Sequence, residues 1–168
     1  MPLTIRPERP GDTCAIEALT IAAFRDAPHS DHTEQFIVSA LRAAGALSLS
    51  LVAEEADAIL GHVALSPVSI SSGATGWFGL GPISVAPERQ GQGIGTRLMH
   101  EALDTLRTQG AAGCVLLGDP AYYRRFGFRP EPELVLADVP AEYFQALSFG
   151  QPLPRGMVTY HQAFAAQR

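Results

Sequence analysis

Cysteine is scarce in this sequence, with only Cys14 and Cys114 among 168 residues. The two lie far apart and do not show the spacing of metal ligands, so we expect no metal site. A single distant pair also disfavours a disulfide framework, and both thiols are expected to be reduced and buried. The chain is therefore expected to rely on an apolar core, for which its length and its 46% of hydrophobic residues suffice.

Runs of positive charge are also missing. The 12 basic residues are scattered, and the formal net charge is −5. Binding to the phosphate backbone of nucleic acid needs clustered basic side chains, so nucleic acid is not expected as a partner. No apolar stretch approaches the roughly eighteen residues that span a bilayer, and the start MPLTIRPERPGD lacks the regions of a signal peptide. We therefore expect a cytoplasmic protein without a membrane partner.

The sequence does contain strand-like and helix-like segments over its whole length. Helical spacing of apolar residues alternates with stretches rich in β-favouring residues. This pattern predicts one domain over residues 1–168, of the α+β class, with a mixed sheet flanked by helices. Strands are expected near 2–6, 47–55, 58–70, 77–87, 114–119 and 157–164, and helices near 13–23, 36–44, 94–106 and 140–147.

A glycine-rich loop precedes the third of these helices, with Gly91, Gly93 and Gly95 within five positions. Glycine in regular structure lowers stability by roughly 0.5–1 kcal/mol, and a ligand that must touch backbone is the usual reason for its presence. The N–H groups and the positive dipole of a helix N-terminus form an anion site. A P-loop would need a lysine that is absent, and in the Rossmann pattern GxGxxG the third glycine would come one position later.

A second feature follows the strand near 114–119, in the segment GDPAYYRRFGF at residues 118–128. Tyr123 lies four residues before Gly127. A phenol, with a pKa of about 10, is protonated at neutral pH and can donate a proton to a leaving group. A core tyrosine is the alternative role for Tyr123.

Together these segments resemble the GNAT superfamily of N-acetyltransferases over nearly the whole chain. The loop fits the family pattern Gln/Arg-x-x-Gly-x-Gly/Ala, and GDPxYYxRFGF is similar to a bacterial subgroup of predicted acetyltransferases. The resemblance implies an α/β/α sandwich-like fold with a mixed, mostly antiparallel sheet. The fourth and fifth strands, about 78–86 and 114–118, would splay apart, and the family suggests a homodimer.

The same resemblance implies acetyl-CoA as co-substrate and no metal. Tyr123 would lie beside the thioester sulfur as the acid for the leaving thiolate. Backbone groups of one strand would pair with pantetheine, and backbone amides of the loop would bind the pyrophosphate. The residues implied in cofactor binding are Ile83, Ser84, Val85, Gln90, Gly91, Gln92, Gly93, Ile94, Gly95 and Thr96.

The sequence indicates the general base less clearly than the proposed acid. Many GNAT enzymes carry a glutamate on the fourth strand, but WFGLGPISV contains no carboxylate. Glu54 and Glu55 lie on one predicted strand, where successive side chains point to opposite faces, and His62 lies on the next. Histidine has a suitable ordinary pKa, although a structural hydrogen bond is its alternative role. Glu54 and His62 are therefore the candidate bases, and solvent is the alternative acceptor of the proton.

These features predict an acetyl-CoA-dependent N-acetyltransferase. The acetyl group would pass directly to a primary amine of a small molecule or a protein, because no cysteine near the motifs is placed to carry it. The alternative is a non-catalytic sensor or interaction module of the GNAT fold that binds acyl-CoA. The missing strand carboxylate favours this alternative, and Tyr123 opposes it.

Overall fold

The chain forms two compact units, which are described one at a time. The structure is a computed structural model that describes residues 2–28 and 30–168. The first unit contains the chain up to Leu65, Gly81–Ala102 and Gln162–Arg168, and the second contains Ser66–Leu80 and Leu103–His161. A single domain over 1–168 stays a prediction, and Met1 and His29 lie outside the described residues.

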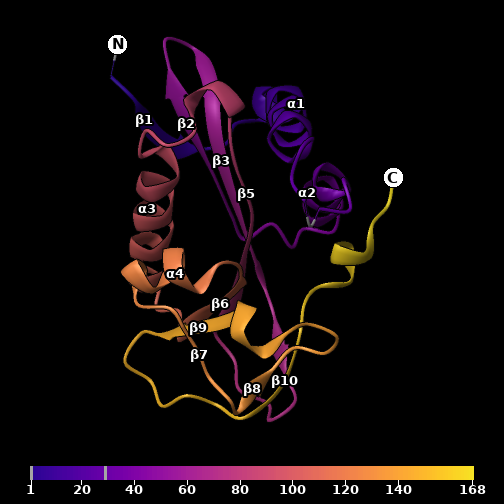
Figure 1. The fold of residues 1–168 in the computed structure, drawn as a ribbon, viewed down its shortest axis with the longest axis vertical. Coiled ribbons are helices and arrows are strands. Elements are labelled where there is room, and N and C mark those ends of the chain that lie inside the picture. Colours follow the sequence, from indigo (N-terminus) through magenta and orange to yellow (C-terminus); the bar gives the residue numbers. More distant parts are fainter. Residues whose placement is uncertain (1, 29) are drawn as a thin grey trace. The chain divides into compact units, whose positions relative to one another are not determined.

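Two strands and one helix contain residues of both units. Figure 1 labels all three. These are β3 (Ala58–Pro67), β5 (Trp77–Val85) and α3 (Ile94–Thr108). The remaining elements of the first unit are β1 (Thr4–Pro7), α1 (Thr13–Phe24), α2 (Glu34–Ala43) and β2 (Leu49–Glu55), with 3₁₀ turns at Pro10–Asp12, Pro87–Arg89 and Gln162–Ala165. Those of the second unit are β4 (Ser69–Ile70), β6 (Gly113–Leu117), α4 (Pro120–Tyr123), β7 (Arg129–Pro130), β8 (Leu134–Val135), β9 (Phe144–Ser148) and β10 (Gly156–Thr159), with 3₁₀ turns at Arg124–Phe126 and Ala141–Tyr143.

In the first unit, β1, β2 and β3 pair antiparallel, and β5 follows β3 in the strand order. Helices α1 and α2 pack on these strands, and their apolar faces meet the sheet in one buried cluster. Its members are Ile16, Val38, Val52 and Ala64. The predicted helical spacing over 13–23 and 36–44 is thus confirmed, because it is this stripe that the helices bury.

Helix α3 approaches β3 closely in the same unit. A side chain at Gly61 would come within 2.9 Å of methyl groups of Ile94 and Leu98. The glycine therefore lets the helix settle against the strand. The buried face of α3 continues through Leu98, Met99, Ala102, Leu103 and Leu106.

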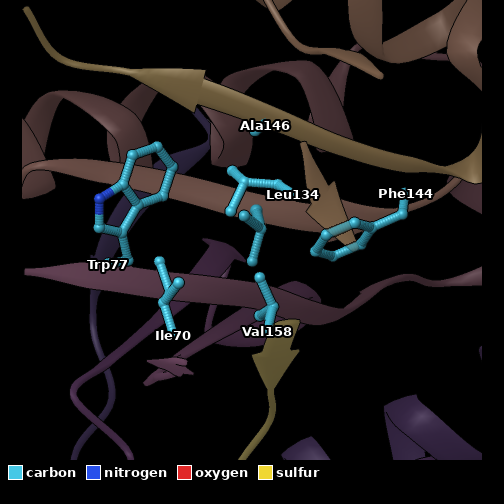
Figure 2. Packing of buried hydrophobic residues seen from close by; sticks show 7 residues of the cluster. Ile70, Trp77, Leu134, Phe144, Ala146 and Val158 are labelled. Atoms are coloured by element: carbon cyan, nitrogen blue, oxygen red, sulfur yellow. The ribbon is translucent and has the colours of Figure 1, made fainter. Parts of the chain in front are cut away.

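In the second unit, β6 pairs parallel with the first residues of β5 and antiparallel with β9, which also pairs with β7. A small sheet has the order β4-β10-β8. Figure 2 shows the core of this unit, in which Leu134 lies between Trp77 and Phe144. The full buried cluster is Ile70, Trp77, Val115, Leu134, Phe144, Ala146 and Val158.

The α+β class with a mixed, mostly antiparallel sheet is confirmed, because among the described ladders only β5–β6 and β8–β10 are parallel. The predicted helix over 140–147 is wrong. Residues 144–148 form β9, since Phe144 and Ala146 fill the core cluster with strand alternation while both edges pair with neighbouring strands. The predicted strand over 157–164 ends at Thr159.

Candidate active site

The glycine loop joins the end of β5 to the start of α3 within the first unit. Gly91 and Gly93 have φ of +75° and +85°, a left-handed conformation that side chains disfavour. A Cβ at either position would meet nothing within 4 Å. The backbone conformation therefore requires glycine, and the space above both residues is open to a ligand.

Side chains of the loop itself hold its shape. The Gln90 side chain donates to the Val85 carbonyl at 3.1 Å, and the Gln92 side chain donates to the Glu88 carbonyl at 3.4 Å. Arg89 donates to Gln92 at 2.9 Å and to Glu55 on β2 at 2.8 Å. The glutamine side chains thus hydrogen-bond backbone carbonyls and support the shape of the loop. The N-terminus of a helix such as α3 can in general bind an anion.

The Arg89–Glu55 pair also fixes the charge at this end of the sheet. The hydrogen bond from Arg89 lowers the pKa of Glu55, and the pKa of Arg89 is raised in turn. Glu55 therefore stays ionised and paired. Because this carboxylate balances the charge of Arg89, the pair adds no net charge beside the loop, and the helix dipole of α3 remains a source of positive potential.

Strand β5 leads into the loop with one edge only partly paired. Its described pairing with β6 ends at Gly79, although β5 continues to Val85. Ile83 and Val85 are half-buried, while Ser84 is buried and its hydroxyl has no hydrogen-bond partner among the described residues. The end of this strand ladder leaves backbone groups available on that edge of β5.

Tyr123 ends the short helix α4 in the second unit. The Asp119 carboxylate accepts from the Ala121 N–H at 2.9 Å as the N-cap, and the Tyr123 N–H donates to the Asp119 carbonyl at 3.0 Å. The aromatic rings of Tyr122, Phe126 and Phe128 pack around Tyr123, with centroids 4.8 to 6.4 Å away. Burial, and then the nearby Tyr122 and Asp119, raise the pKa of Tyr123 to about 12, so the phenol holds its proton at neutral pH.

Gln145 is part of this arrangement although the sequence did not point to it. It lies fully buried on β9 and donates from Nε2 to the Gly118 carbonyl at 2.9 Å, while its Oε1 has no partner among the described residues. Gly118 in turn lies against the Tyr123 ring. In the sequence, the only sign of such a role is that Gln145 is a polar side chain within an apolar stretch. The predicted helix over 140–147 hid this sign, because it did not place Gln145 in a strand.

His62 is fully buried on β3, with Nε2 at 2.8 Å from the Ser50 hydroxyl. Ser50 also hydrogen-bonds Glu8, which accepts from Arg42 at 2.9 Å. Burial lowers the pKa of His62 to about 4, only partly opposed by the charge of Glu8, so the ring is neutral at neutral pH. This environment favours a structural role for His62.

Glu54, the other candidate base, is paired with Arg6 at 3.1 Å. Arg6 also binds Asp12 at 2.8 Å. Hydrogen bonding from Arg6 lowers the pKa of Glu54, which makes the carboxylate a weaker proton acceptor. Glu54 and Glu55 thus have different arginine partners, and each is engaged in an ion pair.

The two cysteines are free, but only Cys114 is buried; Cys14 is exposed, so the prediction of two buried thiols is wrong for Cys14. Within residues 2–28 and 30–168 there is no group of three or more histidine, cysteine and acidic side chains able to hold a metal ion. No helix in that part of the chain is long and apolar enough to cross a membrane.

Comparison with known families shows to which family the chain belongs. The family described as "Acetyltransferase (GNAT) domain" matches residues 46–130, half of the sequence. The chain belongs to the GNAT acetyltransferase family. The matched region contains the glycine loop, Tyr123 and the candidate base His62 of this GNAT chain.

Two relatives from Escherichia coli K12 carry acetyltransferase names. "Uncharacterized N-acetyltransferase YhbS" is 41% identical over 127 residues, which are 75% of this chain and 73% of that protein. "Uncharacterized N-acetyltransferase YjhQ" is 33% identical over 85 residues, which are 49% of this chain and 47% of that protein.

Solved GNAT structures agree with the fold of this chain. A GNAT family acetyltransferase from Brucella melitensis, in complex with acetyl-CoA, superposes with a TM-score of 0.87 at 53% identity, over 97% of this chain and 98% of that one. YhbS from Escherichia coli, in complex with CoA, gives 0.85 at 34% identity, over 99% and 96%.

The sequence-predicted site residues fall into two groups in this GNAT chain. The first unit contains Glu54, His62, the strand residues 83–85 and the loop residues 90–96, of which the strand and loop follow one another along the backbone. The second unit contains Tyr123 with Gly118 and Gln145. Of the two candidate bases, Glu54 is held in an ion pair with Arg6, and His62 is fully buried.

Proposed function

We propose that this protein transfers the acetyl group of acetyl-CoA directly to a primary amine. The observation that carries the proposal is the pair of left-handed glycines, Gly91 and Gly93, with open space above both at the start of α3 in a GNAT chain. The two relatives whose structures contain acetyl-CoA or CoA support the choice of co-substrate.

In this proposal the loop binds the pyrophosphate through its backbone. Open space above the glycines lets phosphate oxygens reach the amides at the N-terminus of α3, where the helix dipole is positive. The partly paired edge of β5 would bind the pantetheine amides. The residues with these roles are Ile83, Ser84, Val85, Gln90, Gly91, Gln92, Gly93, Ile94, Gly95 and Thr96.

Tyr123 is proposed as the general acid. The neutral amine nitrogen attacks the carbonyl carbon, a C–N bond forms, and the C–S bond breaks. The Tyr123 hydroxyl gives its proton to the departing sulfur, and the phenolate regains a proton from the acylated nitrogen. One further proton leaves the substrate ammonium before attack, so an ammonium and a thioester yield an amide, a thiol and one free proton.

Solvent is proposed to take that free proton. Glu54 is held by Arg6, and His62 is buried and neutral beside Ser50. Neither environment favours a base exchanging protons with a substrate. This leaves amine deprotonation to water, and the rate should rise with pH as more of the acceptor amine becomes neutral.

Thiol release tests the proposal. The protein is incubated with acetyl-CoA and a panel of primary amines, and free CoA thiol and acetylated amine are measured together. The chain contains no lysine, so its own side chains offer no competing primary amine. Equal production of thiol and amide supports the transferase. Calorimetric binding of acetyl-CoA without turnover on any amine would support the sensor instead, and no binding would contradict both.

A cytoplasmic location, a homodimer and membership of the GDPxYYxRFGF subgroup stay predictions. The oligomeric state is measured by sedimentation of the purified chain. Whether the acceptor is a small molecule or a protein is tested by including a lysine-containing peptide in the amine panel.

A further inference from the structure

The ladder between β6 and β9 breaks at Gly118, just before α4. Residues 113–117 of β6 pair antiparallel with β9, and the same register places Gly118 opposite Tyr143. Residues of a hydrogen-bonded antiparallel pair exchange both of their backbone hydrogen bonds. The Gly118 N–H does donate to the Tyr143 carbonyl at 3.0 Å. The Tyr143 N–H, however, closes a 3₁₀ turn by donating to the Pro140 carbonyl at 3.1 Å, so it is not available to the Gly118 carbonyl.

The side chain of Gln145 takes the place of this backbone donor. Its Nε2 donates to the Gly118 carbonyl at 2.9 Å. The orientation of the amide follows from this partner, because a carbonyl oxygen can only accept a hydrogen bond. The other amide atom, Oε1, has no hydrogen-bond partner among the described residues, although Gln145 is fully buried.

This hydrogen bond contributes little to stability. A buried acceptor without a partner is unfavourable, and an apolar side chain at position 145 would remove one such acceptor, Oε1. It would leave another in exchange, because the Gly118 carbonyl would lose its donor. The two effects nearly cancel, so the main consequence of the Gln145 amide is the position in which it holds Gly118.

Gly118 in turn supports the proposed acid. The Tyr123 ring lies against Gly118 so closely that a Cβ there would overlap it. Gly118 also directly precedes Asp119, whose side chain caps α4 by accepting from the Ala121 N–H at 2.9 Å. A shift of the Gly118 carbonyl would therefore move both the surface on which the ring lies and the start of the helix that contains Tyr123.

We propose that Gln145 is a positioning residue for Tyr123. The inference rests on the proposed transferase function, in which the Tyr123 hydroxyl protonates the departing sulfur. Gln145 acts through the Gly118 carbonyl, and Gly118 determines where the ring can lie. Small displacements of a catalytic group slow the chemical step strongly, so loss of the amide should lower kcat and leave the binding of acetyl-CoA unchanged.

Gln145→Met removes the amide and keeps the length of the side chain. In steady-state thiol release, kcat should fall about five- to tenfold, as expected for one lost hydrogen bond, with KM for acetyl-CoA and the urea midpoint almost unchanged. Thr20→Val is the matched control, because it removes a buried hydrogen bond of α1, from the Thr20 hydroxyl to the Ile16 carbonyl at 2.7 Å. The control should lower the urea midpoint and leave kcat unchanged. Unchanged kcat in folded Gln145→Met would overturn the proposal.

A double-mutant cycle with Tyr123→Phe shows whether Gln145 acts through the phenol. If Gln145 serves to place the hydroxyl, its loss has no effect on kcat once the hydroxyl is absent. Gln145→Met should therefore lower kcat in the parent chain but not in Tyr123→Phe. Equal fold-losses in the two backgrounds would overturn the proposal, because the amide would then act independently of the proposed acid.

A measurement without substrate separates this inference from the proposed function. Tyrosine labelled with ¹³C at Cζ gives one NMR signal for each of the four tyrosines, and the signal missing from Tyr123→Phe belongs to Tyr123. Gln145→Met should shift this signal, and Thr20→Val should not. A shifted signal without turnover on any amine would support the positioning and contradict the transferase. Turnover with an unmoved Tyr123 signal would support the transferase and overturn the positioning.

Discussion

The ring of Tyr123 lies directly on the backbone of Gly118, leaving no room for a side chain at residue 118. A Cβ there would come within 2.8 Å of Cδ2 of the ring, with Cε2 closer still. The glycine is fixed on both sides, because its carbonyl accepts from Gln145 and its N–H donates to the Tyr143 carbonyl at 3.0 Å. The ring of the proposed acid can therefore occupy this position only because residue 118 has no Cβ.

Replacing Gly118 by alanine should displace Tyr123. The new methyl group overlaps the ring, and a shift of about 1 Å in a catalytic group can lower turnover about 100-fold. We expect kcat to fall by that order with little change in KM for acetyl-CoA, as measured by steady-state thiol release. Gly11→Ala is the matched control, since a Cβ at Gly11 meets nothing within 4 Å, and it should retain full activity. Unchanged kcat in a folded Gly118→Ala protein would contradict this arrangement.

The hydroxyl of Tyr123 can be removed without its ring. Tyr123→Phe keeps the packing against Gly118 and the neighbouring aromatic rings but loses the proton donor. General acids contribute about 10²–10⁴-fold, so kcat should fall at least about 100-fold while calorimetric affinity for acetyl-CoA is retained. Tyr143→Phe applies the same change to an exposed tyrosine and should have no effect. Full activity of Tyr123→Phe would assign the acid role elsewhere.

The pH dependence of kcat gives an independent test of the acid. Burial raises the pKa of Tyr123 to about 12, so its phenol remains protonated throughout the usual assay range. Activity should therefore rise with pH as the acceptor amine loses its proton, and should show no decline between about pH 8 and 10 from loss of the tyrosine proton. A decline there, absent from Tyr123→Phe, would mean that the phenol titrates lower than its environment implies.

Gly93→Asp should abolish CoA binding and leave the fold intact. Aspartate tolerates the left-handed region better than most residues, and open space above Gly93 accommodates the side chain. Its negative charge would then occupy the proposed phosphate site. Gly73→Asp is a close control, because Gly73 has a similar φ of +89° and the same open surroundings. Calorimetry should show loss of CoA binding only in Gly93→Asp, and equal affinities would contradict the site.

The local parts of the fold and of the site were predictable from sequence. The glycine loop, the long apolar face of α3 and the Tyr123 segment each depend on residues close together in the chain, so local sequence patterns indicate where they lie. The role of Tyr123 comes from the resemblance to the GNAT family and stays a prediction. The helix predicted over 140–147 is wrong because Phe144 and Ala146 belong to a strand that pairs with β6 and β7. These partners lie elsewhere in the chain, so the local sequence pattern does not indicate them. For the same reason, the partners of Gln145 and His62 emerged only with the strand register.

Acid should destabilise the protein through His62. Its pKa is about 4 in the folded chain and about 6.5 when unfolded, so the unfolded state binds more protons between these values. Stability is therefore lost as the pH falls from about 6.5 to about 4, by about 3 kcal/mol from this group. Urea unfolding of the parent chain and of His62→Gln should show a shallower pH slope in the variant. Parallel slopes would contradict the shifted pKa.

The unequal burial of the two thiols has a practical consequence for handling the protein. Cys14 is exposed, while Cys114 is fully buried and burial raises the pKa of its thiol. A thiol-specific dye should therefore label one sulfur in each native chain and two in each denatured chain. The number of dye molecules bound per chain therefore reports the folded fraction of any variant. Replacing Cys14 with serine removes the exposed protein thiol, so that in the native protein the dye detects only the CoA thiol.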